Sequence, residues 1–154
     1  MVWEFKQIAN SSRLSFNINK LSNISTLQLT YNIPTTSPMG KLVEEFNTYR
    51  AKMNERIMDS ANTNIKRFFA LDTTSYAEGA LPVKTKEMLG LVASMVLRCD
   101  DCIKYHLEKC YNEGVTHDEM NEIFMIANLV GGSIVIPHYR RAVEFWDELN
   151  EAGV

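Results

Sequence analysis

The sequence is poor in cysteine and in long apolar runs, and neither charge dominates it. Three cysteines in 154 residues are too few and odd in number for a secreted disulfide scaffold. The longest apolar stretches, residues 89–97 and 129–137, fall short of the roughly 20 residues that span a bilayer. The first thirty residues lack the apolar core of a signal peptide. The net charge is −3, and no cluster of Lys or Arg suggests nucleic acid or an anionic membrane as a partner. We therefore expect a cytoplasmic protein that binds neither.

The chain divides into two parts of different composition. Fifteen of residues 1–38 are Ser, Thr or Asn, and this part carries a net charge of +2, which leaves −5 on residues 39–154. The first part has short alternating apolar runs without a turn pair to link them, and it ends at Pro34 and Pro38. We expect residues 1–38 to form a poorly ordered polar extension. An alternative is that translation begins at Met39 and that the preceding residues are an upstream artefact of annotation.

Residues 39–154 show helical periodicity throughout, with apolar side chains at spacings of three and four. The first two stripes comprise Leu42, Phe46, Tyr49, Met53 and Ile57, and then Ile65, Phe68, Phe69 and Tyr76, before a break at Gly79 and Pro82. A third helix, from about Thr85 to Val96, is apolar on most faces, which predicts a central position. A fourth runs from about Asp100 to Asn112 and stops at Gly114, which tolerates the left-handed conformation.

Two further helices complete the pattern. Thr116 and Glu119 match a capping box that opens a fifth helix, and this helix turns Met120, Ile123, Phe124, Ala127 and Val130 inward before Gly131 and Gly132 break it. After Pro137, the sixth helix has an inner face of Tyr139, Ala142, Val143, Trp146 and Leu149. The sequence therefore predicts an all-α fold, a compact bundle of about six helices with short loops and a polar N-terminal extension.

The residues with reactive side chains cluster at the start of the fourth helix. Cys99 and Cys102 lie three residues apart, and at a helix N-terminus their Cα atoms can approach the roughly 5.5 Å that a disulfide requires. His106 lies one turn beyond Cys102 on the same side, within reach of the thiol's proton. A reactive thiol needs such a base or the positive end of a helix dipole. We therefore interpret the pair as a dithiol that cycles to a disulfide.

Other interpretations of these residues are weaker. A zinc site would join Cys99, Cys102 and His106 to a fourth ligand such as Cys110. However, eleven residues at about 1.5 Å of rise put Cys99 and Cys110 roughly 16 Å apart, against Zn–ligand bonds of about 2.0–2.3 Å. Covalent haem attachment needs His directly after the second cysteine, where this chain has Ile103. The two thiols could also be core residues by chance, and for Cys110 a buried hydrophobic role is the favoured interpretation.

Four residues at fixed spacings along the chain resemble the signature of a known family. Eleven residues separate Glu87 from Cys99, two separate Cys99 from Cys102, and three separate Cys102 from His106. This spacing resembles the signature of the carboxymuconolactone decarboxylase superfamily in its redox branch, the alkyl hydroperoxide reductase D (AhpD)-like proteins. The likeness covers about Met39 to Leu149. By itself, an acid at the position of Glu87 would be read as a surface partner of the helix dipole.

The resemblance implies an all-helical fold that assembles into trimers or hexamers, and a thiol-dependent peroxidase or disulfide reductase activity without a cofactor or metal. By analogy, Cys102 attacks a hydroperoxide, Cys99 resolves the product, Glu87 and His106 relay the proton, and an external dithiol reduces the disulfide. Helix-dipole reasoning alone would favour Cys99 as the more acidic thiol. Two alternatives are lactone decarboxylation, as in the superfamily's namesake enzymes, and a non-enzymatic helical assembly or metal-binding module.

One departure from the pattern concerns charge. AhpD itself has a histidine directly before the second cysteine, where this chain has Asp101 beside Asp100. Negative charge disfavours a thiolate, and we expect Arg98 and Lys104 to offset part of it. For His138, which follows Pro137, an ordinary surface or capping role is the favoured interpretation over one in the pocket or an interface.

Overall fold

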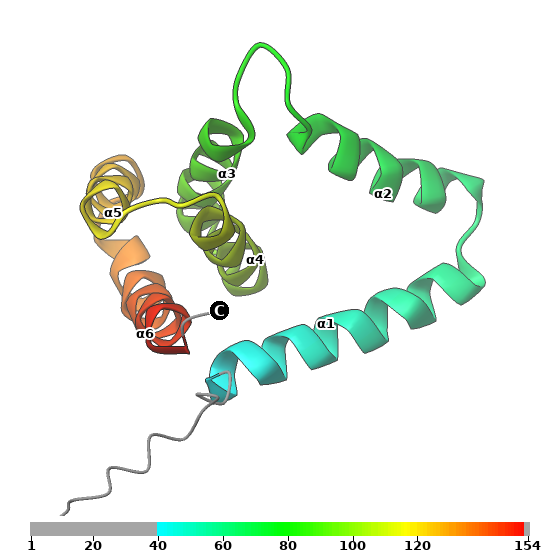
Figure 1. Ribbon diagram of the computed structural model, residues 1–154, viewed down its shortest axis with the longest axis horizontal. Coiled ribbons are helices and arrows are strands. Elements are labelled where there is room, and N and C mark those ends of the chain that lie inside the picture. Colours follow the sequence, from blue (N-terminus) through cyan, green and yellow to red (C-terminus); the bar gives the residue numbers. More distant parts are fainter. Residues whose placement is uncertain (1–39, 153–154) are drawn as a thin grey trace, which may run out of the picture. The chain divides into compact units, whose positions relative to one another are not determined.

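The computed structural model describes residues 40–152, and this part of the chain contains six α-helices, one 3-10 turn and no strand (Figure 1). The all-α prediction is confirmed, whereas the predictions for residues 1–38 and for a start at Met39 lie outside the described residues. The elements are α1 (Lys41–Ser60), α2 (Thr63–Tyr76), α3 (Val83–Leu97), α4 (Asp100–Asn112), α5 (His117–Gly131), η1 (Ser133–Val135) and α6 (Ile136–Ala152).

Local sequence signals explain where the helices begin and end. The predicted capping box at the start of α5 is present: the Thr116 hydroxyl accepts from the backbone N–H of Glu119, and the Glu119 carboxylate accepts from the N–H of Thr116. The bounds of α4 agree with the prediction, and Gly114 follows it with a φ of +68°. Pro137 lies within the first turn of α6, not before it, because the N–H that proline lacks has no partner in a first turn.

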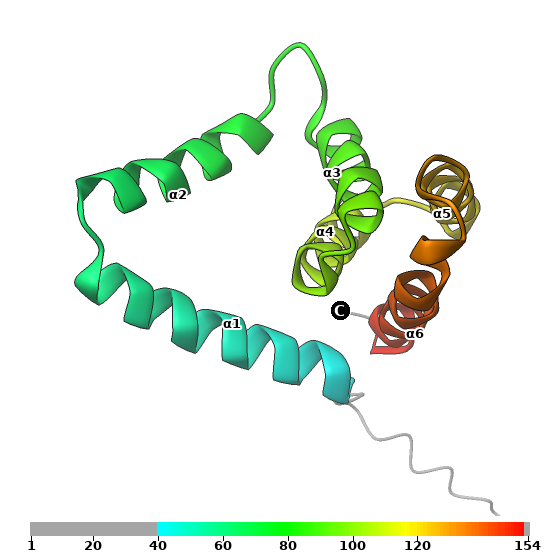
Figure 2. The same ribbon diagram turned by 180° about the vertical axis from the view of Figure 1, so that it is seen from behind.

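The core lies where α3, α4, α5 and α6 pack together, and α3 is central as predicted because it contacts α2, α4 and α5. Figures 1 and 2 show α3 and α4 side by side, with α5 and α6 next to them. The largest fully buried side chains are Trp146, Phe124, Phe145, Leu91, Met95, Ile103, Leu107, Met120 and Leu149. These residues hold α4, and with it the cysteine pair, against two neighbouring helices.

Helices α1 and α2 are attached to this core less extensively. Phe46 of α1 packs edge-on against Phe145 of α6 at 5.8 Å between ring centroids, and the Glu148 carboxylate accepts from the N–H of Leu42 at the start of α1. Helix α2 has no fully buried residue and packs mainly on α3. No helix in the described part is long and apolar enough to cross a membrane.

The apolar stripes found in the sequence are only partly buried. Several of their members are more than a third exposed, namely Tyr49, Ile57, Ile65, Phe68 and Val130. The inward position predicted for Val130 is wrong, and the other four belong to apolar stripes that no neighbouring helix of the described residues covers. Periodicity identifies the apolar face of a helix, and it does not identify what packs on that face.

The capping box generates a test of local stability. We expect Thr116→Ala to lower the free energy of unfolding by about 1 kcal/mol, because the side-chain acceptor for the N–H of Glu119 is lost. Thr116→Ser keeps the hydroxyl and should stay within a few tenths of a kcal/mol of the parent protein. Urea denaturation followed by circular dichroism measures both variants. Equal losses in the two would show that the hydroxyl does not cap α5.

Candidate functional site

Cys99 and Cys102 form a disulfide at the N-terminus of α4, with their Cα atoms 5.2 Å apart. Cys99 is the N-cap residue of the helix, and its sulfur accepts a long hydrogen bond of 3.4 Å from the N–H of Cys102. The turn from α3 is tight because Arg98 adopts the left-handed conformation (φ 60°, ψ 38°), which lets the N–H of Cys99 bond to the carbonyl of Ser94. The disulfide that the spacing of the two cysteines predicts is therefore present.

Glu87 and His106 form a buried pair between α3 and α4. The Oε2 atom of Glu87 lies 2.7 Å from Nδ1 of His106, and the two residues are 2% and 7% exposed. Glu87 is thus not on the surface. A carboxylate only accepts, so Nδ1 carries the hydrogen and the lone pair of a neutral imidazole is on Nε2. The structure thereby joins two of the four residues singled out in the sequence and fixes which nitrogen of His106 is free to accept a proton.

Two residues that sequence reasoning did not assign to the site pack around His106. The hydroxyl of Tyr76, at the end of α2, lies 3.5 Å from Nε2 of His106. Burial and the nearby charge of Glu87 raise the pKa of Tyr76, so it stays a donor at neutral pH. A β-carbon on Gly90 would lie 2.6 Å from both His106 Cε1 and the Tyr76 hydroxyl. The signal available in the sequence was a glycine one turn after Glu87 in an otherwise apolar helix.

A cavity of about 330 Å³ opens beside Cys102 and His106. Phe46, Tyr49, Arg50, Met53 and Asn54 of α1 line one side of it, and Asp101 and Tyr105 of α4 line the other, with Asp72 contributed by α2. The guanidinium of Arg50 lies 4.3 Å from the centre of the Tyr105 ring. Cys99 and Glu87 do not line this cavity. A molecule in it would therefore meet Cys102 rather than Cys99.

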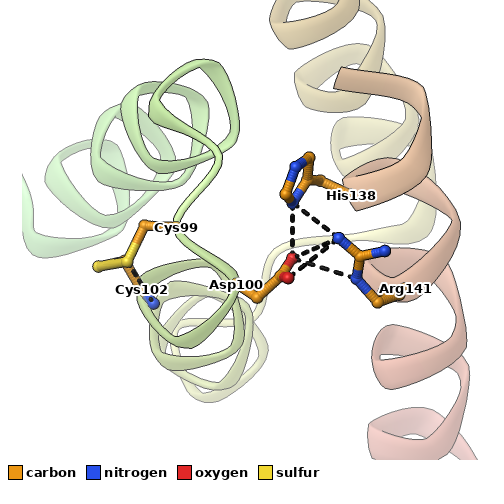
Figure 3. A network of polar contacts seen from close by, with 5 residues as sticks. All are labelled: Cys99, Asp100, Cys102, His138 and Arg141. Carbon is orange, nitrogen blue, oxygen red and sulfur yellow. Dashed lines mark hydrogen bonds and ion pairs between the residues drawn. A yellow bond between two sulfur atoms is a disulfide. The ribbon is translucent and has the colours of Figure 1, made fainter. Parts of the chain in front are cut away.

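The charge of Asp100 is balanced by residues that the sequence analysis did not choose. Figure 3 shows Asp100 turned toward α6, where Nδ1 of His138 lies 2.7 Å from its Oδ1, and Arg141 donates to both carboxylate oxygens. Burial raises the pKa of Asp100, but the hydrogen bonds from His138 and Arg141 outweigh it and leave the pKa below its ordinary value. The partners of Asp100 are thus His138 and Arg141, and neither Arg98 nor Lys104 forms an ion pair with it. His138, for which the sequence favours a surface or capping role, is half-buried and lies against the carboxylate of Asp100.

Cys110 lies one turn beyond His106 and has no disulfide partner. It is fully buried, and burial raises the pKa of its thiol to about 12. A thiol with that pKa is neutral at physiological pH and unreactive, so the expectation of a buried hydrophobic role is confirmed. Within residues 40–152, no group of three or more His, Cys, Asp or Glu side chains is arranged to hold a metal ion.

The contact at Gly90 generates a second test. Gly→Ala in a helix interior ordinarily stabilises a protein by about 0.5–1 kcal/mol. At Gly90 the new methyl group meets an imidazole that Glu87 holds in place, so we expect Gly90→Ala to lower the free energy of unfolding by about 1–3 kcal/mol. Gly79→Ala is the control, because the nearest atom to its β-carbon is Nζ of Lys86 at 3.7 Å. A Gly90→Ala protein more stable than the parent in urea would contradict this packing.

Comparison with known proteins places this geometry in a family. The sequence profile of the carboxymuconolactone decarboxylase family matches residues 64–145. Two curated bacterial relatives are similar. Uncharacterized protein 4 in the cox locus of Paracoccus denitrificans is 28% identical over 85 residues, 55% of this chain and 77% of that protein. The 4-carboxymuconolactone decarboxylase of Acinetobacter baylyi is 30% identical over 57 residues, 37% of this chain and 42% of that enzyme.

Solved structures agree with this assignment. A Thermotoga maritima protein of the same family, for which a role in an antioxidative response has been suggested, is 55% identical. Its two crystal structures give TM-scores of 0.69 and 0.67, cover 70% of this chain and are themselves covered to 95% and 91%. A Legionella pneumophila family protein, 20% identical, shares the fold with a TM-score of 0.66 over 71% of this chain and 98% of its own. Since the family profile spans more than half of its residues, the chain belongs to the carboxymuconolactone decarboxylase family.

Proposed function

We propose that the chain is a thiol-dependent peroxidase of the AhpD-like type, an oxidoreductase that reduces hydroperoxides through the Cys99–Cys102 pair. The observation that carries the proposal is the disulfide at the N-terminus of α4, beside a cavity that Cys102 and His106 line together. The suggested antioxidative role of the Thermotoga protein supports the same chemistry. A dithiol that must be regenerated in each cycle suits a reducing compartment, so we place the protein in the cytoplasm.

The first step oxidises Cys102. Its thiolate attacks the terminal oxygen of the hydroperoxide, so that an S–O bond forms, the O–O bond breaks, and an alcohol leaves with a proton. His106 takes the thiol's proton on Nε2 and returns it to the leaving alkoxide, while Glu87 stabilises the imidazolium through Nδ1. The cavity supports Cys102 as the attacking sulfur, because that residue lines it and Cys99 does not.

The second and third steps regenerate the enzyme. The sulfur of Cys99 attacks the sulfenic acid of Cys102, an S–S bond forms, and the hydroxyl leaves as water with the thiol proton. An external dithiol then reduces the disulfide by exchange through a mixed disulfide and is itself oxidised. The Cα separation of 5.2 Å lies within the range that a disulfide requires.

Cysteine variants test the cycle. We expect Cys102→Ser to abolish hydroperoxide consumption in the presence of a dithiol, because the attacking sulfur is gone. Cys99→Ser should stop after one turnover and accumulate a sulfenic acid or a mixed disulfide, which mass spectrometry detects. Cys110→Ala is the control with unchanged turnover, since that thiol is buried and neutral. Full turnover by both Cys102→Ser and Cys99→Ser would overturn the proposal.

Two other functions would give different results in the same samples. A lactone decarboxylase does not need the cysteine pair, so decarboxylation that survives Cys102→Ser would favour the chemistry of the Acinetobacter relative. A metal-binding module would contain stoichiometric zinc after purification and no thiol that a disulfide reagent can titrate. Thiol titration before and after one equivalent of hydroperoxide separates both from a peroxidase.

We also propose that the protein assembles with copies of itself, as the family resemblance implies. In support, five large apolar side chains at the end of α5 and in η1 are between 45% and 81% exposed: Met125, Ile126, Leu129, Val130 and Ile134. An exposed apolar patch of this kind marks an interaction surface, and most homo-oligomers form closed symmetric assemblies such as the trimer or hexamer expected here.

Light scattering coupled to gel filtration tests the assembly. We expect Leu129→Glu to reduce the mass of the particle to that of one chain or a smaller assembly, because a carboxylate would be buried unpaired at the contact. Asn121→Glu, an exposed position two turns earlier on α5, introduces the same charge outside the apolar patch and should leave the mass unchanged. A parent protein that elutes as a monomer would refute the proposal.

A further inference from the structure

A polar cluster outside the cavity joins the first turn of α4 to α6. Arg141 donates from Nε and Nη2 to Oδ1 of Asp100 at 3.2 and 3.1 Å, and from Nη2 to Oδ2 at 3.0 Å. Nδ1 of His138 lies 2.7 Å from the same Oδ1. Charge-assisted bonds at several atoms of one carboxylate fix its orientation as well as its charge. Helix α4 is therefore anchored to α6 through the residue that directly follows Cys99.

Asp100 stands between the two cysteines in the sequence, so its charge bears on both sulfurs. A carboxylate near a thiol disfavours the thiolate and raises the thiol pKa, whereas a cation has the opposite effect. Figure 3 shows that Asp100 points toward α6, while Cys99 and Cys102 lie on the other side of the first turn. Arg141 and His138 hold the carboxylate in that direction, and the guanidinium of Arg141 supplies the opposing charge.

We propose that Arg141, with His138, is a positioning residue for the redox pair, which keeps the thiolate of the reduced state accessible by orienting and neutralising Asp100. The inference deepens the proposed function, because it assumes that Cys99 and Cys102 cycle between dithiol and disulfide. A more stable thiolate favours the reduced form and makes the pair a stronger oxidant. Arg141 acts through Asp100, since the cysteines lie away from the α6 side chains in Figure 3.

Arg141 is the member of the cluster to remove first. Nδ1 of His138 lies 2.7 Å from Asp100 and 2.9 Å from Nη2 of Arg141. A guanidinium only donates, so Nδ1 either donates to Asp100 or accepts from Arg141. If Nδ1 accepts, one N–H of Nη2 goes to His138, and Nε and the other N–H of Nη2 still bond to the carboxylate of Asp100. The remaining charged groups around the pair, which the variants leave in place, are Glu87, Arg98, Asp101, Lys104 and His106.

The experiment measures the equilibrium of the full-length protein with glutathione, in which the disulfide and two glutathiones yield the dithiol and glutathione disulfide. We expect Arg141→Met to lower the equilibrium constant for reduction about threefold, a size typical of one partly screened charge. This corresponds to a potential about 14 mV more negative at 29.6 mV per tenfold change. Asp100→Asn, which has nearly the same shape, should raise the constant about threefold. The pH dependence of iodoacetamide alkylation should show the thiol pKa rising in Arg141→Met and falling in Asp100→Asn.

Two controls separate charge from structure. Arg141→Lys keeps the charge and should remain close to the parent protein in both measurements. Arg140→Met removes the same charge from the neighbouring exposed position of α6, which forms no ion pair among residues 40–152, and should leave the potential unchanged.

Two results would overturn the proposal. One is equal potentials and thiol pKa values in the parent, Arg141→Met and Asp100→Asn proteins. The other is a shift of both variants in the same direction, which a loosened contact between α4 and α6 would produce. Asp100→Asn decides the matter if Arg141→Met does not fold. Hydroperoxide consumption by the parent protein is a separate readout. If it is absent while the two variants shift in opposite directions, the peroxidase proposal fails and the role of Arg141 stands.

Discussion

The arrangement of the site depends on a carboxylate buried between two helices. Glu87 is 2% exposed, and an ionised carboxylate in such a place is stable only with a close hydrogen-bonded partner. His106 is that partner, and it lies on the next helix along the chain. The bond therefore fixes how α3 and α4 are aligned, and it leaves room for the imidazole only because Gly90 has no side chain. Any change in this alignment would move His106 relative to Glu87. It would also move Cys102, which lies one helical turn before His106.

Helix α4 is held from two sides by polar groups, and the two contacts have different effects. On the α3 side, Glu87 holds Nδ1 of His106 in a hydrogen bond. On the α6 side, Arg141 and His138 bind Asp100. The cysteine pair therefore lies on a helix with two polar contacts: Glu87 leaves Nε2 of His106 free, and Arg141 balances the charge of Asp100. Core residues such as Leu107 and Trp146 pack these helices closely enough for both contacts to persist.

Much of the fold and part of the site could be predicted from the sequence because the relevant signals are local. The capping box of Thr116 and Glu119 and the bounds of α4 follow from residues within a few positions of one another. The contact of Asp100 with Arg141 spans 41 positions, and no rule of spacing links them. Phe68 has the periodicity of a buried residue and yet is 70% exposed. Burial depends on which surfaces meet, and a single sequence does not contain that information.

The left-handed turn at Arg98 has an evolutionary consequence. Arg98 is the only non-glycine residue with a positive φ among those the structure describes, and it directly precedes Cys99. Asparagine and glycine adopt that conformation at lower cost than most residues, whereas a β-branched side chain resists it. The backbone at this position therefore restricts which side chains it accepts at low cost. Across related proteins, valine, isoleucine and threonine should therefore be rare at this position, which sets the turn that leads into the disulfide.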